Sequence, residues 1–158
     1  MKILGFRRAR VEDARRVFAI LNEVASEIPL VLDTPERGQA IRAVVESCCQ
    51  HGPSWITLDE TGRIVGFLLG KMTTSDLVQM EFAGLELVYG GMTTGQRGHG
   101  AFANLLAQAK ALGLPLRAVV KHGNKSRMGQ RLERQQFVRT ASLRPNEDTF
   151  VWTPPPTC

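Results

Sequence analysis

Apolar and polar residues alternate with the period of an α-helix through most of the first fifty positions. Across residues 12–27 apolar side chains recur every three or four positions and charged ones occupy the opposite side, which predicts an amphipathic helix. Pro29 should end it, because the residue before a proline is disfavoured in the helical region. Thr34 can then cap a second helix whose first position suits Pro35, and its apolar spacing continues to about His51.

Later apolar runs are shorter and are bounded by turn residues, which is typical of strands. Residues 54–59 and 64–72 flank a short polar turn and predict a hairpin. The strands are expected at 3–8, 54–59, 64–72, 82–92, 116–121, 137–143 and 149–153, and two further helices at 124–135 and in a stretch that ends at Leu112. This order, β-α-α-β-β-β-α-β-α-β-β, indicates an α/β (α+β) protein.

A glycine-rich segment, residues 91–101, joins the strand 82–92 to the helix that follows. Glycines let the main chain turn tightly and approach a ligand closely, and the first turn of a helix offers unpaired N–H groups. A phosphate or diphosphate group is therefore the expected ligand. The segment lacks both the three-glycine spacing of a dinucleotide-binding loop and the Gly-Lys-Ser/Thr ending of a P-loop.

Length and composition fit one globular domain. The chain has 158 residues, 43% of them hydrophobic and 22% charged, so we expect a single domain over residues 1–153 and a proline-rich tail at 154–158. It has no apolar run of the roughly 20 residues that a membrane span requires. The N-terminal segment is charged too early for a signal peptide, so a cytoplasmic protein without membrane contacts is expected. The three cysteines have no metal-ligand spacing, and no metal site is expected.

Positive charge is concentrated in one part of the chain. Residues 97–139 contain nine Lys or Arg and one acid, whereas the net charge of the whole chain is +5. Such a block attracts an anionic ligand, but it is equally typical of a solvated basic face or of an RNA-binding surface. Charge alone does not separate these interpretations.

The glycine-rich segment resembles the coenzyme A loop of the GCN5-related N-acetyltransferases. The usual motif of that family, Arg-Gly-x-Gly-x-Gly/Ala-x-x-Leu-Leu, is similar to residues 97–106, which begin Arg97-Gly98 and end Leu105-Leu106. The order of strands and helices resembles the family's over essentially the whole chain. The resemblance implies a mixed, mostly antiparallel central sheet flanked by helices, and acetyl-CoA as the acetyl donor. One departure is visible, because Phe102 stands where the family has glycine or alanine; its ring could turn outward, or the helix could lie farther from the diphosphate.

The resemblance also implies which residues bind the cofactor. Main-chain groups of Met92 and Thr93 would bond the pantetheine arm like an added strand, and main-chain N–H groups of the loop and helix start would hold the diphosphate. The implied cofactor-binding residues are Met92, Thr93, Gln96, Arg97, Gly98, His99, Gly100, Ala101, Phe102 and Asn124.

Transfer of an acetyl group to an amine requires a proton acceptor for the amine and a donor for the leaving thiolate. The resemblance makes Glu86 the candidate base, acting directly or through water, although it could equally be solvated or ion-paired. The family's usual tyrosine in the later helix is replaced by Leu132. His122 and Ser126 are then the candidate acids, unless no protein acid is needed. Strand alternation turns Tyr89, the one tyrosine of the chain, away from Glu86 and suggests a packing role.

The acceptor pocket in this fold is built largely by the first two helices and their connection. Residues 28–33 are mostly apolar, and Glu23, Glu27, Asp33 and Glu36 surround them, which favours a cationic amine on a small molecule or peptide. These acids could also be helix-end charges in water. Two other functions stay open: a toxin-like acetyltransferase of aminoacyl-tRNA, and a relative that binds acyl-CoA without catalysis. The sequence leaves acceptor identity, acyl length and a homodimeric state undetermined.

Overall fold

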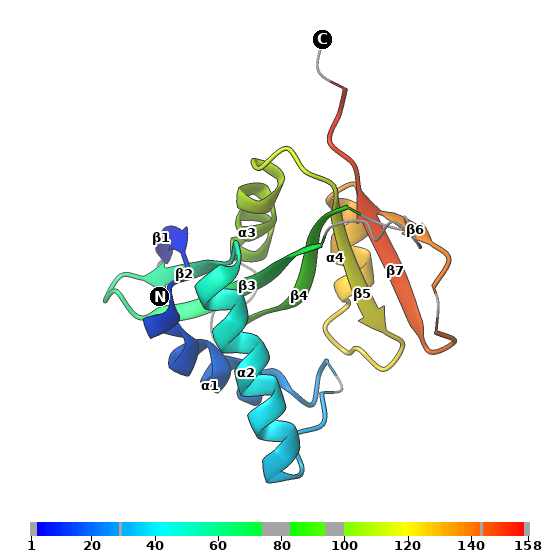
Figure 1. The fold of residues 1–158 in the computed structure, drawn as a ribbon. Helices are drawn as coiled ribbons and strands as arrows, with labels where there is room; N and C mark the ends of the chain where they lie inside the picture. The colour runs from blue at the N-terminus through cyan, green and yellow to red at the C-terminus, as the bar shows by residue number, and fades with distance from the viewer. Residues whose placement is uncertain (1–2, 29, 74–82, 94–99, 143, 157–158) are drawn as a thin grey trace.

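The computed structural model describes residues 3–28, 30–73, 83–93, 100–142 and 144–156, and within them the chain forms a seven-stranded sheet with helices on both faces (Figure 1). The elements in chain order are β1 (Ile3–Arg8), the 3-10 helix η1 (Val11–Asp13), α1 (Ala14–Val24), α2 (Pro35–His51), β2 (Trp55–Asp59), β3 (Ile64–Thr73), β4 (Gly84–Met92), α3 (Ala101–Lys110), β5 (Leu116–Lys121), α4 (Met128–Arg134), β6 (Val138–Thr140) and β7 (Glu147–Trp152). The predicted order of helices and strands is confirmed.

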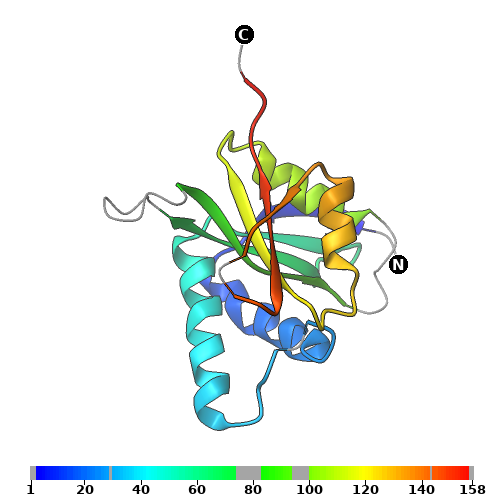
Figure 2. The same cartoon turned by 90° about the vertical axis from the view of Figure 1, so that its right-hand side faces the viewer.

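Neighbouring strands run antiparallel in the order β1-β2-β3-β4-β5-β7-β6, except that β4 and β5 are parallel. Helices α1 and α2 cover one face of the sheet, and α3 and α4 cover the other (Figure 2). This is the mixed, mostly antiparallel sheet that the family resemblance implied. After Trp152 the described part of the tail extends away from the body (Figure 1).

Local signals explain how several helices begin. Thr34 caps α2 as predicted, because its Oγ1 accepts a hydrogen bond from the main-chain N–H of Arg37 at 3.2 Å. Helix α1 is shorter than predicted, since Val11–Asp13 forms the 3-10 turn η1 and Val24 is its last residue. Helix α4 begins four residues later than predicted, because Arg127 adopts a left-handed conformation with φ of 58°.

Two apolar clusters hold the layers together. On the α1/α2 face, Val17, Ile20 and Leu21 of α1 are fully buried against strand residues such as Phe67 and Leu69. On the α3/α4 face, the fully buried set includes Leu105 and Leu106 of α3, Leu132 of α4, and Leu85, Leu116 and Phe150 of the sheet. Burial of these side chains fixes both helix layers relative to the central strands.

Cys48 and Cys49 are both buried in the α1/α2 cluster. Burial raises the pKa of the Cys49 thiol to about 12. Burial also raises the pKa of the Cys48 thiol, so both thiols are protonated at neutral pH. Within the described residues no cluster of three potential metal ligands occurs, and no helix there is long and apolar enough to cross a membrane.

Strand β4 contains a β-bulge, and it changes which side chains share a face. Leu69 of β3 pairs with Tyr89, whereas the next residue, Gly70, pairs with Leu87, so Val88 is an extra residue on β4. Lys71 pairs with Glu86, and Leu69 and Lys71 lie two positions apart on β3.

Glu86 and Tyr89 therefore share the α1/α2 face, whereas Gly90 and Met92 face α3. The prediction that Tyr89 points away from Glu86 is wrong. Simple alternation fails here because one inserted residue reverses the direction of every side chain after it.

Candidate functional site

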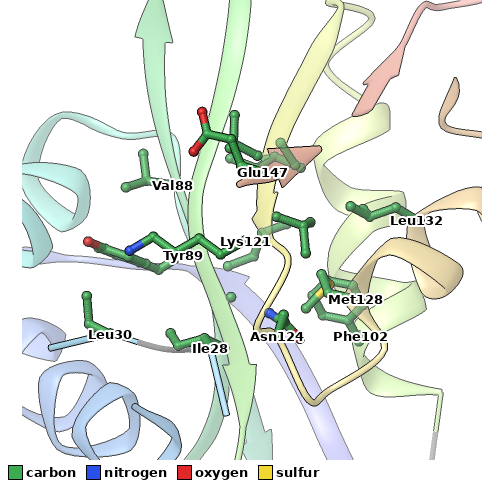
Figure 3. A pocket seen from close by; sticks show the side chains of 16 residues that line it. Ile28, Leu30, Val88, Tyr89, Phe102, Lys121, Asn124, Met128, Leu132 and Glu147 are labelled. Carbon is green, nitrogen blue, oxygen red and sulfur yellow. The ribbon is translucent and has the colours of Figure 1, made fainter. Parts of the chain in front are cut away.

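The candidate site is a slot between β4 and β5. These parallel strands pair only over Leu85–Leu87 and Leu116–Ala118, and beyond these residues they diverge. A cavity of about 230 Å³ occupies the opening (Figure 3). Its walls come from four parts of the chain: β4, β5, the α1–α2 connection, and the α3/α4 layer. The cavity therefore lies between the two helical layers, at the one parallel junction of the sheet.

Main-chain groups of β4 line the open side of this slot. The N–H of Thr93 donates to the carbonyl of Val65 at 2.9 Å, so that peptide group already bonds within the sheet. Antiparallel strands alternate between bonded and non-bonded pairs, and the peptide groups of Met92 and Gly90 therefore point the other way, toward the slot. Beyond Leu87 no pairing with β5 uses them. Of the two residues predicted to bond pantetheine, Met92 directs its main-chain N–H and carbonyl toward the slot, whereas Thr93 directs its own toward β3.

Gly90 allows a close approach of the α3 layer to β4. A Cβ added at Gly90 would lie 3.2 Å from Cε2 of Phe102 and 3.2 Å from Cδ1 of Leu68. The Phe102 ring thus turns inward over the strand and borders the cavity, rather than turning outward (Figure 3). It is half-buried and also borders a smaller adjoining cavity beside Gly91 and Met92. The aromatic ring stands between the two cavities.

The glycine-rich segment is described only from Gly100 onward. The predicted cofactor residues Gln96, Arg97, Gly98 and His99 lie outside the described residues. Gly100 precedes α3 in the left-handed region with φ of 71°, a conformation that favours glycine. Ala101 and Phe102 follow in the first turn of α3, where main-chain N–H groups lack helical partners. The described end of the segment therefore presents main-chain N–H groups without helical partners at the start of a helix, an arrangement that suits an anion.

Asn124 borders the cavity and is held in place by Ser126. Oδ1 of Asn124 accepts hydrogen bonds from the main-chain N–H and the Oγ of Ser126, at 2.8 and 2.5 Å. The N–H of Asn124 donates to the carbonyl of Lys121 at 2.9 Å. These contacts leave the side-chain amino group of Asn124 as a fixed donor at the cavity wall. Ser126 itself borders the smaller cavity, beside Arg131.

Glu86 forms an ion pair with Arg117, with 2.6 Å between Oε2 and Nε. Its side chain is 21% exposed, and burial raises the pKa of this carboxyl despite the opposing effect of Arg117. Glu86 does not line the cavity, although it shares the α1/α2 face with Tyr89. The ion-paired state that sequence reasoning left open is the one observed, and contact with a bound amine would require an intervening water.

The predicted acids lie in different surroundings. His122 is exposed, with Nε2 3.3 Å from Oδ1 of Asp148, and neither His122 nor Ser126 lines the main cavity. Glu86, His122 and Ser126 are therefore not gathered around one reacting centre. Leu132, where the family has tyrosine, is fully buried at the cavity wall.

Three polar residues that line the cavity were not predicted as site residues from the sequence: Tyr89, Lys121 and Glu147. The bulge at Val88 directs Tyr89 to the α1/α2 side, and burial raises the pKa of its phenol. Lys121 and Glu147 are cross-strand partners on β5 and β7. Only the pairing of these strands brings the two together, so no sequence signal was available to identify them.

The α1–α2 connection contributes apolar rather than acidic side chains to the cavity. Ile28 and Leu30 line it, as the predicted apolar wall requires. Asp33 is exposed and pairs with Arg37 at 2.8 Å, and neither Asp33 nor Glu36 lines the cavity. These two acids are helix-end charges, which was the alternative interpretation.

Comparisons with known proteins find similarity in structure but no similar sequence. No protein-family model matches the sequence, and no curated protein matches it significantly. Among solved structures, a histone acetyltransferase HPA2-related acetyltransferase from Corynebacterium glutamicum is 19% identical over 99% of both chains, with a TM-score of 0.72. An acetyltransferase of the GNAT family from Listeria monocytogenes is 15% identical over 95% of this chain and 94% of its own, with a TM-score of 0.69.

A third similar structure was solved with ligands. Diaminobutyrate acetyltransferase EctA from Paenibacillus lautus, in complex with L-2,4-diaminobutyric acid and coenzyme A, is 16% identical over 97% of this chain and 95% of its own, with a TM-score of 0.65. Together these likenesses show that the chain has the fold of the GCN5-related N-acetyltransferases, which confirms the predicted fold class.

Proposed function

We propose that the protein is an N-acetyltransferase that moves an acetyl group from acetyl-CoA to a primary amine of a small molecule or peptide, by direct attack in a ternary complex. The observation that supports this most strongly is the slot itself. Peptide groups of Gly90 and Met92 that do not pair with β5 point toward the opening, where Gly90 lines the main cavity and Met92 lines the smaller one. The main cavity lies between the two helical layers, and we infer that donor and acceptor meet there.

The described residues fit coenzyme A on the donor side. Peptide groups of Gly90 and Met92 can bond an extended amide chain as an added strand would, and Asn124 offers a fixed amino donor beside them. Gly100 and the first turn of α3 suit a diphosphate. When bound, acetyl-CoA supplies an activated acetyl thioester. The family resemblance implies that residues 96–99 also bind the cofactor, and we include them in the proposed binding site.

The bulge provides the donor that the reacting carbonyl needs. Val88 is the extra residue of β4, so its peptide group is outside the regular ladder and borders the cavity. A main-chain N–H at this position can stabilise negative charge on the thioester oxygen. The apolar walls, Ile28 and Leu30 among them, exclude water and strengthen that interaction.

Proton transfer is assigned to two residues on the α1/α2 face. Glu86 accepts the proton of the amine through water, and its raised pKa makes it a stronger base than an ordinary carboxylate. Tyr89 borders the cavity and keeps its proton because its pKa is raised, so its hydroxyl is the proposed donor to the leaving thiolate. Tyr89 takes this role in place of His122 and Ser126, which lie outside the cavity.

The alternative of an RNA substrate has less support. Several cations of the basic block are engaged within the fold: Lys110 donates to the carbonyl of Gln135 at 2.6 Å, Arg117 pairs with Glu86, and Arg139 pairs with Glu133. These three side chains are therefore already committed to contacts within the protein. Strong, salt-sensitive binding of tRNA would reverse this preference.

Two measurements test the proposed function. Calorimetric titration should detect binding of acetyl-CoA and CoA at micromolar concentration and much weaker binding of ATP. Incubation with acetyl-CoA and a panel of amines should release CoA thiol together with an acetylated product. Binding without turnover on small amines, peptides or charged tRNA would favour the non-catalytic alternative, and equal affinity for ATP would contradict the proposed donor site.

A further inference from the structure

Two opposite charges lie at the acceptor side of the slot without forming an ion pair. Lys121 and Glu147 are directly opposite each other on antiparallel strands, a position where a cation and an acid usually interact. Both line the cavity, yet neither has an ion-pair partner among the residues that the structure describes. In Figure 3 the Lys121 side chain extends across the slot toward β4, and the Glu147 carboxylate points away from its amino group.

These charges lie on the face opposite to the proposed coenzyme site. Lys121, Val119 and Arg117 alternate onto the α1/α2 face of β5, because Leu116, Ala118 and Val120 pack in the α3/α4 cluster. Glu147 faces the same way as its cross-strand partner. The proposed diphosphate and pantetheine contacts come instead from α3 and the splayed edge of β4. Lys121 and Glu147 are therefore available to the acceptor.

Beside the two charges the cavity is mostly apolar and small. Ile28 and Leu30 of the α1–α2 connection face Val88 and Val119 of the diverging strands. The volume of about 230 Å³ must also contain the acetyl end of the donor, so the acceptor part that enters is limited to a few heavy atoms. An apolar body with one positive and one negative group matches this lining.

We propose that the acceptor is a small aliphatic amine that also bears a carboxylate, the chemical class of the neutral aliphatic amino acids. This inference rests on the proposed function. Lys121 Nζ binds the carboxylate, and Glu147 attracts the ammonium group before it loses its proton. In the transfer, a C–N bond forms between the amine and the acetyl carbonyl carbon as the C–S bond breaks. The amine's proton passes through water to Glu86, and the thiolate receives a proton from Tyr89. The product nitrogen is neutral, so Glu147 no longer attracts it.

The test compares three amines of similar shape: leucine, leucinamide and 3-methylbutylamine. Wild-type protein should acetylate leucine with a kcat/KM about tenfold or more above that of the other two, as expected for one charged hydrogen bond. Lys121→Gln should abolish this preference, because it should lower kcat/KM for leucine by about tenfold or more relative to kcat/KM for 3-methylbutylamine. Glu147→Gln should raise KM for all three amines. Arg63→Gln, a change of one exposed cation in the β2–β3 turn, is the matched control and should change none of these values.

Different outcomes separate the two proposals. Equal acetylation of all three amines by the wild-type protein, or a Lys121→Gln variant that loses the same factor with each, would overturn the inference and leave acetyl transfer intact. If no amine is acetylated, the proposed function fails. Calorimetric binding of leucine to the CoA complex then decides the inference, which is overturned if leucine does not bind or if Lys121→Gln leaves its affinity unchanged. Unchanged CoA affinity in each variant establishes that the fold is retained.

Discussion

Replacement of Phe102 by alanine should destabilise the protein and yet tighten its binding of CoA. The ring is half-buried and lies against Gly90, whose peptide group faces the slot. If pantetheine bonds this part of β4, the ring must rotate away and lose its contacts with the strand. The cost of that movement weakens binding by the wild-type protein, and the alanine variant does not incur it.

The size of each effect follows from the packing. Phe→Ala costs about 3–5 kcal/mol in a full core, so a half-buried ring should contribute about 2 kcal/mol. For a chain of this length that loss lowers Tm by about 4–8 °C. Only the contacts with β4 are broken on binding, which we take as about 1.4 kcal/mol, so CoA affinity should rise by up to about tenfold.

Thermal unfolding and calorimetric titration with CoA measure these two quantities. Phe18→Ala is the matched control. Phe18, on α1, is also half-buried, but its ring packs against Arg42 of α2, outside the slot. It should lower Tm to a similar extent and leave CoA affinity unchanged. A Phe102→Ala variant that binds CoA more weakly than wild type would refute the reasoning, because the ring would then be a contact of the ligand rather than an obstacle.

Three further predictions concern the site and its support. Glu86→Gln and Tyr89→Phe should each lower kcat at least about tenfold and leave CoA affinity unchanged. Because the pKa of Glu86 is raised, the acid limb of the wild-type pH–rate profile should lie above the ordinary pKa range of a glutamate. Unaltered kcat in both variants would contradict the proton assignments. Ser126→Ala should weaken CoA binding several-fold, because it removes the hydroxyl donor to Asn124 Oδ1 and leaves only the main-chain N–H of residue 126 to hold it. A variant that binds CoA as well as wild type would show that this hydroxyl does not position Asn124 for the ligand. Asp13→Asn should cost about 1–3 kcal/mol at neutral pH, since this carboxylate is buried and accepts two hydrogen bonds from its arginine partner. The folded-state pKa of Asp13 is lowered, so its contribution is complete above the unfolded pKa and is lost as pH falls through the folded value, and the difference between the two proteins in denaturant titrations should shrink in acid.

Elements whose signals are local were predictable from the residues alone. Thr34 and Pro35 mark the start of α2, and the observed cap uses the Thr34 hydroxyl as expected. Gly113, three residues after the end of α3, has φ of 73°, a left-handed conformation that is common where helices end. Apolar spacing in α1 identified the buried face, because a helix places residues three and four apart on one side. The order of elements and the glycine-rich segment then indicated the fold.

The candidate site was predictable only in part, because it depends on strand pairing. Met92 was expected to bond a ligand through its main chain, and the ladder directs the peptide groups of Met92 and Gly90 to the slot. The bulge at Val88 was not visible in the sequence, since a bulge arises from the competition of two registers between strands rather than from any residue preference. It reversed the direction of Tyr89 and with it the expected composition of the acceptor side.

The sequence by itself determined which segments become helices and strands, where the helices are capped, and that a glycine-rich turn joins β4 to α3. Each of these depends on interactions between residues close together in the chain. The tertiary structure decided that β4 and β5 diverge, that Phe102 lies over Gly90, and that Lys121 and Glu147 are cross-strand neighbours which both line an apolar cavity. These features join residues far apart in the chain, and their contacts depend on the packing of both helical layers against the sheet at once.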